Sequence, residues 1–157
     1  MSYQDFENAL ELASRCKNYT VRGTVSDEVI SNAEILFGYK FSEQTYNFLK
    51  KVGYLSFTGH EFFGICNDDF TGDHHGNMIE STLADRKDYQ LPREWLTIYF
   101  FDDGYYGYLD YSKLNKSGEP SVIMAIYNGR EYEMVEKVAN DFGEFILKCV
   151  ENKRERN

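Results

Sequence analysis

The residues best suited to metal or acid–base chemistry gather between positions 60 and 75. They are three histidines and three aspartates: His60, His74, His75, Asp68, Asp69 and Asp73. Adjacent residues such as His74 and His75 point to different sides of either a helix or a strand, so both could bind one ion only in a special loop. We therefore expect no metal site here, and catalysis by these residues is kept as an alternative.

Residues 67–78 partly match a calcium-binding loop. Oxygen-bearing side chains stand at relative positions 1, 3 and 5, and Gly72 stands at position 6. Position 12 is Met78, where the loop requires a bidentate Glu. The match therefore fails, and residues 66–76 are predicted to form an acidic surface loop.

Motifs for nucleophilic or nucleotide chemistry are missing from the sequence. It contains neither a Gly-x-Ser-x-Gly elbow nor a glycine-rich phosphate loop. Cys66 is the cysteine nearest to His60 and His74, but no neighbouring basic residue in the sequence would favour its thiolate. We predict a protein without a cofactor and without enzyme activity.

The most distinctive stretch is Phe100–Asp110, which reads FFDDGYYGYLD. Alternation along a strand would place one set of residues on one face and a second set on the other: Tyr106, Tyr108 and Asp110 opposite Tyr105, Gly107 and Leu109. Exposed Tyr beside Asp is typical of protein-binding surfaces, where carboxylates select basic partners. The alternative, which the sequence supports equally, is that these tyrosines line a sheet face beneath the helices.

This stretch and the acidic loop together supply the predicted partner-binding residues. The set consists of Asp68, Asp69, Asp73, Asp102, Asp103, Tyr105, Tyr106 and Asp110. Turns and loops carry recognition because a rigid sheet holds them while their side chains stay free to contact a partner.

Charge and hydropathy exclude several classes of protein. The 157 residues include 17 Lys and Arg against 26 Asp and Glu, giving a formal net charge of −9, which disfavours contact with nucleic acid and suits a basic partner. No run approaches the roughly 18 apolar residues of a membrane helix. The N-terminus lacks the features of a signal peptide, so the cytoplasm is the expected compartment. The spacing of Cys16, Cys66 and Cys149 fits neither a disulfide framework nor a zinc site.

Helical periodicity and capping residues predict five helices. They span Tyr3–Lys17, the residues from N-cap Ser26 to Phe37, those from N-cap Ser42 to Gly53, Met78–Tyr89, and a closing helix that contains Val138, Phe142, Phe145, Ile146 and Cys149. In the second helix the expected buried row is Val29, Ala33 and Leu36, flanked by Ile30 and Phe37.

Short aromatic and β-branched runs predict the strands. They are Tyr54–Phe57, His60–Ile65, Trp95–Phe101, Tyr105–Tyr111, Val122–Tyr127 and a further strand at Glu131–Val135. Sequential strands joined by short turns favour a largely antiparallel sheet. The predicted fold class is therefore α+β, one domain over residues 1–157, with helices packed around the sheet and residues 151–157 as a frayed basic tail.

The order of these elements resembles the SUKH superfamily, also called the Smi1/Knr4 family. The helical stretch Val29–Val52 resembles its opening motif through Ala33-Glu34, Leu36, Gly38, Phe41, Tyr46 and Phe48-Leu49. Trp95–Asp110 resembles the second motif, a strand, an acidic-glycine turn and an aromatic strand ending in Asp, and Glu144, Phe145 and Ile146 fit the C-terminal helix. The chain departs from the family pattern at Phe41-Ser42, usually Leu-Pro, and after Gly53, where a glycine-rich segment is usual.

This resemblance implies an immunity protein that binds and neutralises a cognate polymorphic toxin of the LXG type. The implied partner is the C-terminal nuclease domain of that toxin, whose cationic active-site region the acidic protein would occlude. Two alternatives stay open: a small hydrolase or metal-dependent enzyme that uses His60, His74 and His75, and a signalling or scaffold adaptor of the Smi1/Knr4 type.

Overall fold

The computed structural model describes residues 3–70, 72 and 74–152. Within this part of the chain, seven strands form one antiparallel sheet in which every strand lies beside its neighbours in the sequence. The predicted α+β fold is confirmed. In chain order the elements are α1 (Tyr3–Ser14), β1 (Thr20–Val21), α2 (Asp27–Phe37), α3 (Glu43–Lys51), β2 (Leu55–Phe57), β3 (His60–Phe62), α4 (Met78–Tyr89), β4 (Trp95–Asp102), β5 (Tyr105–Leu114), β6 (Pro120–Tyr127), β7 (Tyr132–Ala139) and α5 (Phe142–Glu151).

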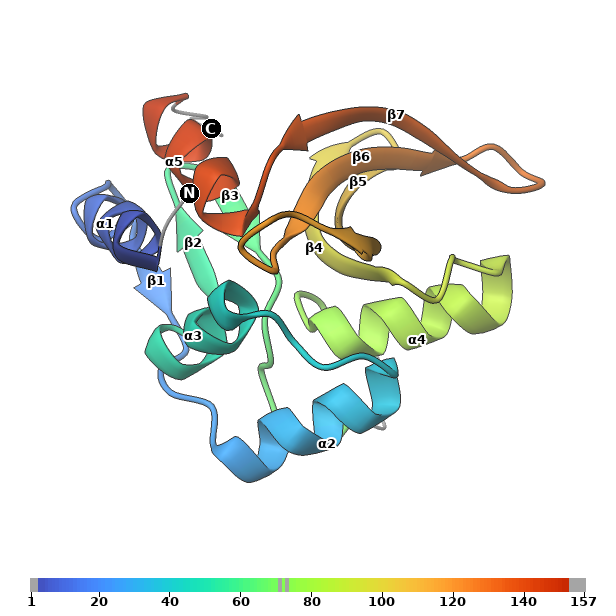
Figure 1. The fold of residues 1–157 in the computed structure, drawn as a ribbon, viewed down its shortest axis with the longest axis horizontal. Coiled ribbons are helices and arrows are strands. Elements are labelled where there is room, and N and C mark those ends of the chain that lie inside the picture. Colours follow the sequence, from blue (N-terminus) through green and yellow to red (C-terminus); the bar gives the residue numbers. More distant parts are fainter. Residues whose placement is uncertain (1–2, 71, 73, 153–157) are drawn as a thin grey trace.

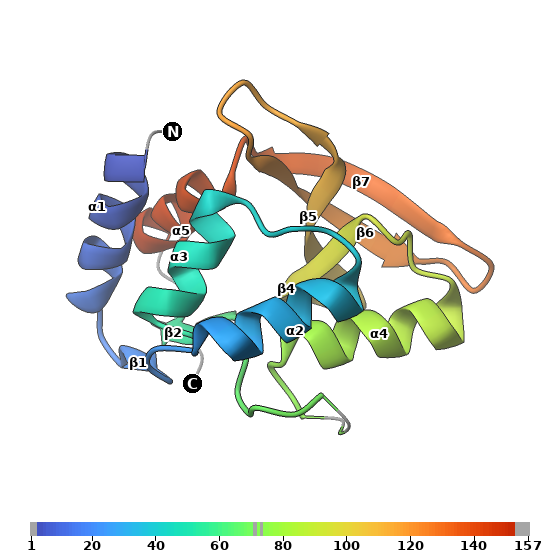
Figure 2. The same cartoon turned by 60° about the horizontal axis from the view of Figure 1, so that its bottom comes forward.

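The helices lie in two groups around this sheet (Figure 1). Helices α1, α3 and α5 lie together beside β2 and β3, whereas α2 and α4 lie side by side beneath the longer strands β4, β5 and β6. The connection between β3 and α4 projects away from both groups (Figure 2).

Aromatic side chains form the centre of the core between the sheet and α5. The rings of Phe48 and Phe142 lie 4.8 Å apart, and the ring of Phe145 packs edge-on against Phe62 and Tyr99. All five side chains are buried, and burying each one stabilises the fold by about 1.5–3 kcal/mol. This contact holds β3 and β4 firmly against the C-terminal helix.

The predicted caps of the second and third helices are confirmed. The side chain of Ser26 accepts a hydrogen bond from the N–H of Val29, and that of Ser42 accepts one from the N–H of Thr45. Each cap satisfies a free donor at a helix start and is worth about 1 kcal/mol. Gly38 ends α2 with a φ of 99°, a left-handed conformation that glycine adopts easily because it has no Cβ.

Two predicted helix boundaries were wrong. Val138 lies in β7, and α5 begins only after Asp141, whose side chain caps it by accepting from the N–H of Glu144. Helix α1 ends at Ser14 instead of Lys17. Periodicity extended both helices into flanking residues because it ignored the local cap and the neighbouring strand.

The buried face of α2 also differs from the predicted row. Leu36 is 42% exposed, and Phe37 takes the core position instead. Arg86 of α4 contacts this end of α2, where its guanidinium donates to the carbonyl oxygens of Leu36 and Phe37 and lies 4.9 Å from the centroid of the Phe37 ring. This contact ties the C-terminal end of α2 to α4.

A two-residue turn joins β4 to β5. Asp102 pairs with Tyr105 across it, and Asp103 and Gly104 between them have φ values of 53° and 86°. Positive φ at both central residues is typical of a type I′ turn, for which Asp-Gly is a favoured sequence. The predicted turn is confirmed, and it presents both aspartates to solvent.

Candidate functional site

Glycine backbone contacts close the loop between β3 and α4. The N–H of Gly64 donates to the carbonyl of Gly76 at 2.9 Å, and the N–H of Met78 donates to the carbonyl of Gly64 at 2.8 Å. A Cβ on Gly64 would lie 1.7 Å from the carbonyl oxygen of Gly53, so only glycine fits. The two ends of the loop are therefore held side by side, and β3 ends at Phe62 instead of the predicted Ile65.

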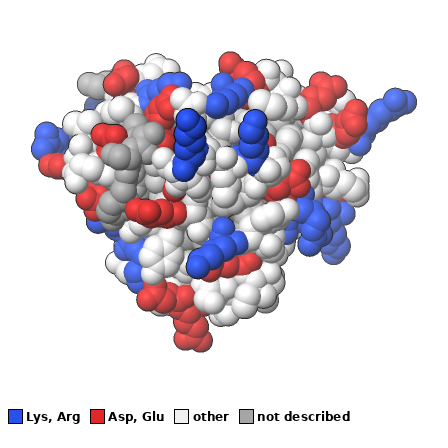
Figure 3. Space-filling view, in the orientation of Figure 1, with Lys and Arg blue, Asp and Glu red and all other residues white. Residues whose placement is uncertain are grey.

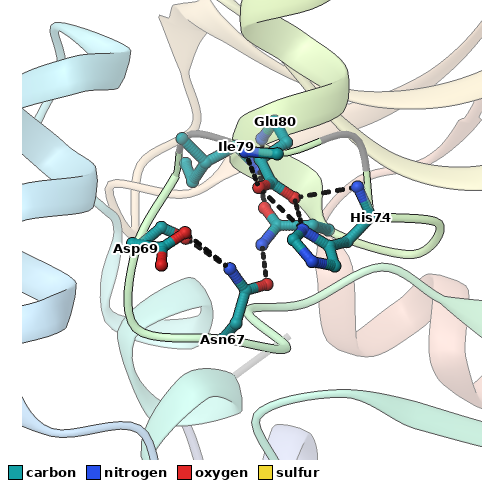
Figure 4. A network of polar contacts seen from close by, with 7 residues as sticks. Asn67, Asp69, His74, Ile79 and Glu80 are labelled. Carbon is teal, nitrogen blue, oxygen red and sulfur yellow. Dashed lines mark hydrogen bonds and ion pairs between the residues drawn. The ribbon is translucent and has the colours of Figure 1, made fainter.

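Buried polar groups in the first turn of α4 hold the loop itself (Figure 4). The Glu80 carboxylate accepts hydrogen bonds from the backbone N–H groups of Gly72 and His74, at 2.9 and 3.1 Å, and contacts His74 Nδ1 at 3.0 Å. Asn77 caps α4 through Oδ1, and its Nδ2 donates to Asn67 Oδ1 at 3.3 Å. Hydrogen bonds that satisfy a buried carboxylate fix the groups that donate them.

A pocket of about 440 Å³ lies between this loop, α4 and the β4–β5 hairpin, and we call it the aromatic pocket. Its lining combines three aromatic rings with small and polar side chains: Phe63, His74, His75, Ser81, Ala84, Asp85, Phe100 and Tyr106. The rings of Phe100 and Tyr106 lie 4.9 Å apart, and His75 packs edge-on against Phe63. The pocket therefore presents ring faces beside one helix.

The titratable groups of the aromatic pocket are Asp85, Tyr106 and two histidines. Of its described lining residues, none is Lys or Arg, and Asp85 supplies a carboxylate from the wall formed by α4. Burial, and next the charge of Asp85, raises the pKa of the Tyr106 phenol, so this tyrosine stays neutral at physiological pH. The two histidines are engaged by acidic residues, His74 by Glu80 and His75 Nε2 by Glu61 Oε1 at 2.7 Å.

The structure separates the three histidines of the enzyme alternative. His74 and His75 lie in the loop, whereas His60 is buried on β3 with Nδ1 2.7 Å from the Tyr99 hydroxyl and Nε2 2.7 Å from the carbonyl oxygen of Asn152. That carbonyl can only accept, so Nε2 donates to it, and in the neutral imidazole Nδ1 then accepts from Tyr99. His60 thus joins β3 and β4 to the end of α5.

The described residues contain no group of three or more His, Cys, Asp or Glu arranged to hold a metal. Burial is the main cause that raises the pKa of the Cys66 thiol, which disfavours the nucleophilic thiolate. Among the same residues, none of the helices has the length and apolar character needed to cross a membrane.

The predicted acidic loop residues lie beside different neighbours. Asp68 is exposed and pairs with Arg22 at 3.1 Å, whereas Asp69 accepts from the Asn67 side chain through its backbone and carboxylate oxygens. Asp73 lies outside the described residues. The loop therefore presents two described aspartates at its start, and its histidines line the aromatic pocket further along.

The predicted residues of the hairpin divide between its two ends. Asp102 and Asp103 lie at the turn, and Tyr105 and Tyr106 follow on opposite faces of β5, with only Tyr106 lining the aromatic pocket. Asp110 lies about 17 Å from Tyr105 along β5. There its Oδ1 accepts from the N–H and the hydroxyl of Ser112. The structure thus brings Tyr106 together with the loop and places Asp110 away from it.

Sequence reasoning missed most of the residues that shape the aromatic pocket. Ser81, Ala84 and Asp85 stand three and four positions apart on α4, so they share one face of the helix. That face carries small and acidic side chains where a buried helix would carry large apolar ones, and this pattern could have indicated a hollow. Phe63 gave no comparable signal, because aromatic residues are common throughout this chain, and Phe100 began the distinctive stretch but was not among the predicted binding residues.

A second hollow, of about 530 Å³, lies at the opposite end of β5, and we call it the lysine pocket. Except for Leu114, its lining residues are polar or charged, and three of them are lysines: Asp110, Lys113, Leu114, Asn115, Lys116, Ser117, Glu119, Ser121, Lys137 and Asn140. On the face drawn in Figure 3, basic and acidic side chains are interspersed, so this face carries no continuous acidic surface.

Comparison with known proteins gives one family. The model of the family SUKH_6, described as SMI1-KNR4 cell-wall, matches residues 27–146. The match begins at α2 and ends within α5, so it includes the loop, α4 and the β4–β5 hairpin that form the aromatic pocket. No curated protein matches the sequence.

Proposed function

The chain belongs to the SUKH_6 family of SMI1-KNR4 proteins, and from this membership we propose that it is an immunity protein that binds a bacterial toxin. SUKH proteins are in general non-enzymatic immunity proteins, and a binding role requires no catalytic residue of this chain. Within the family the sequence resembles the Bacillus immunity protein YobK, and we propose that the two proteins are closely related.

The aromatic pocket and the acidic turn beside it are the observation that carries the proposal. Phe100 and Tyr106 line the pocket, and the exposed Asp102 and Asp103 follow directly at the end of β4. Rings of this kind supply contact area, and carboxylates around them select a basic partner and speed its approach. A binding surface built on a type I′ turn is also rigid before the partner arrives, which lowers the entropy lost on association.

We propose that the partner is the C-terminal nuclease domain of a polymorphic LXG-type toxin, met in the cytoplasm. A nuclease that grips phosphates presents Lys and Arg, so an acidic protein with a net charge of −9 complements it and can occlude its active-site region. The reading frame next to this one is the first place to seek the toxin.

Replacing Asp102 and Asp103 by Asn tests the proposed surface. Asn keeps the tolerance for positive φ that the turn needs, so the variant removes charge without straining Asp103. We expect binding of the neighbouring toxin domain to weaken by about 2–5 kcal/mol if the pair is desolvated in the complex, and association to slow most at low salt. Calorimetry and stopped-flow mixing at several salt concentrations measure both effects.

A matched variant, Glu131→Gln with Glu136→Gln, removes the same charge from exposed positions around β7. We expect it to change the affinity by less than about 0.5 kcal/mol. If both double variants bind and protect cells equally well, the interface lies elsewhere. A wild-type protein that fails to bind the toxin at all would refute the immunity function itself.

A further inference from the structure

We propose that Asn128, in the turn between β6 and β7, is a site of spontaneous covalent modification. The backbone nitrogen of Gly129 attacks the side-chain amide carbon of Asn128, ammonia leaves, and hydrolysis of the resulting ring yields aspartate or isoaspartate. The chain supplies both reacting groups, so the only co-reactant is water. This inference does not depend on the proposed function, and it can be tested on the free protein.

The turn between β6 and β7 contains the only Asn-Gly pair of the sequence, Asn128-Gly129. Every other asparagine that has a successor is followed by a residue that carries a Cβ. A Cβ on the following residue crowds the approach of its backbone nitrogen to the asparagine side chain, and glycine has no such atom. The sequence therefore favours the reaction at Asn128 over every other asparagine.

Hydrogen bonds within the turn activate the amide of Asn128. Its Oδ1 accepts from the backbone N–H groups of Arg130 and Glu131, at 2.8 and 3.0 Å. When a nucleophile adds to Cγ, negative charge develops on Oδ1, and donors that already contact this oxygen stabilise that charge. The turn therefore holds the amide in place and stabilises the atom that becomes charged.

The nucleophile, the backbone nitrogen of Gly129, is open to reaction. Within the described part of the chain, the N–H of Gly129 donates no hydrogen bond that would have to break. A Cβ placed on Gly129 would meet no other atom within 4 Å, and both Asn128 and Gly129 are exposed. Solvent can therefore remove the proton that the nitrogen must lose before it attacks.

The atoms of the reaction balance across one peptide bond. A bond forms between the Gly129 nitrogen and Asn128 Cγ while the bond between Cγ and Nδ2 breaks. The proton lost from the N–H of Gly129 is replaced, through solvent, by one taken up at Nδ2, which leaves as ammonia, and no atom is oxidised or reduced. Water then opens the cyclic imide, giving aspartate when it adds to the former side-chain carbonyl and isoaspartate when it adds to the backbone carbonyl.

The loss of the amide changes the contacts of the turn. Asn128 Nδ2 donates to Glu133 Oε1 at 2.6 Å, whereas an aspartate would bring a second carboxylate against Glu133. Like charges that face each other across a hairpin are destabilising, and isoaspartate also adds a carbon to the backbone. Tyr127 and Tyr132 form the last pair of the two strands beside this turn. We therefore expect the modification to loosen this end of the β6–β7 hairpin.

Mass spectrometry of the folded protein, incubated in mildly alkaline buffer and then digested, tests the proposal. We expect the peptide that contains Asn128 to gain the mass of an amide-to-acid exchange and to separate into aspartate and isoaspartate forms. Peptides with the other asparagines should change at least about tenfold more slowly, because no glycine follows them. An Asn128 peptide that stays unchanged in the folded protein, whether or not the urea-unfolded chain converts, would overturn the proposal.

Asn115 is a matched control, because it has a similar place in the β5–β6 turn. Its Oδ1 also accepts from two backbone N–H groups, those of Ser117 and Glu119 at 2.8 and 3.0 Å, but the next residue is Lys116. We expect Lys116→Gly to make Asn115 convert at least about tenfold faster than in wild type. If Asn115 converted as fast as Asn128 in wild type, or did not respond to Lys116→Gly, glycine would not control the reaction and the proposal would be refuted.

Asn128→Asp reproduces one product and tests the structural consequence. We expect hydrogen exchange at the backbone N–H groups of Arg130 and Glu131 to become about threefold faster, because two carboxylates then face each other. Glu133→Gln in the same protein removes one of these charges and should restore the wild-type exchange rates. Wild-type exchange rates in Asn128→Asp itself would overturn the expected loosening of the hairpin.

Discussion

The two ends of β5 are both hollowed, but they carry opposite kinds of side chain. The aromatic pocket near Tyr106 has ring faces and Asp85, with Asp102 and Asp103 close by, whereas the lysine pocket near Asp110 has three lysines and no aromatic ring. The net charge of −9 is therefore not a uniform property of the surface. A basic partner is steered by the field of the whole protein but is stabilised only where carboxylates and rings are gathered.

Glu80 at one end and Glu119 at the other are both buried carboxylates, and the two differ in how well they are satisfied. Glu80 accepts three hydrogen bonds from the loop that borders the aromatic pocket. Glu119 accepts at Oε2 from the N–H of Gln44, while its Oε1 has no hydrogen-bond partner in the described part of the chain. The aromatic pocket is thus bounded by a firmly held loop, and the lysine pocket contains an under-satisfied acid.

The largest effect is expected from Glu80→Ala, which removes the carboxylate that holds the loop beside the aromatic pocket. The variant leaves the loop donors without their acceptor, so we expect the free energy of unfolding to fall by about 2–3 kcal/mol. Urea unfolding measures the loss, and hydrogen exchange at the backbone N–H groups of Gly72 and His74 should become faster. Toxin binding should weaken as well, because the wall of the pocket moves.

Glu80→Gln is the control for this variant, because it keeps a carbonyl oxygen that can accept. We expect it to retain most of the stability lost in Glu80→Ala. An unfolding free energy in Glu80→Ala within about 0.5 kcal/mol of wild type would mean that the loop is not held by this carboxylate.

A smaller effect is expected from Glu119→Gln, and it should depend on pH. Burial, the main cause, raises the pKa of Glu119 above its ordinary value of 4.5, so folding favours the protonated acid. The stabilisation is complete below the unfolded pKa and is lost as the pH rises through the folded pKa. Gln cannot ionise, so we expect the variant to lose less stability than wild type when the pH is raised from 4 to 7.

Unfolding in urea at a series of pH values measures this difference. Asp88→Asn, at an exposed position, controls for the general loss of a negative charge. Parallel pH profiles of Glu119→Gln and wild type would show that the buried acid does not titrate differently in the folded state.

The sequence predicted the parts of the fold that depend on local rules. Caps such as Ser26 and Ser42, the stop at Gly38 and the Asp103-Gly104 turn act within three or four residues, so their signals are complete in the sequence. The wrong position of Leu36 has a different origin. Phe37 is buried in its place, and its contact with Arg86 of α4 is a tertiary contact that the local sequence does not show.

The candidate site was predicted only in part for the same reason. The aspartates of the loop and of the turn stand out as charges, but the pocket between them depends on Gly64 and Gly53, whose close approach is a tertiary contact. Asp110 was grouped with Asp102 because both lie in one acidic and aromatic stretch. In the sheet, however, Asp102 lies at the β4–β5 turn, whereas Asp110 lies well along β5, opposite Trp95. Residues that share one short sequence stretch can therefore lie far apart in the sheet.

The smallest effect is expected at the lysine pocket, from Lys113→Ala with Lys116→Ala. Both side chains are exposed at the β5–β6 hairpin, so their removal should change the affinity for the toxin by less than about 0.5 kcal/mol. The variant makes the net charge more negative by two, so association with a basic partner should become slightly faster at low salt and unchanged at high salt. Stopped-flow rates measured beside those of Asp102→Asn with Asp103→Asn compare the two ends directly. A tenfold loss of affinity in the lysine variant, with wild-type binding in the aspartate variant, would place the interface at the lysine pocket and would favour an acidic partner.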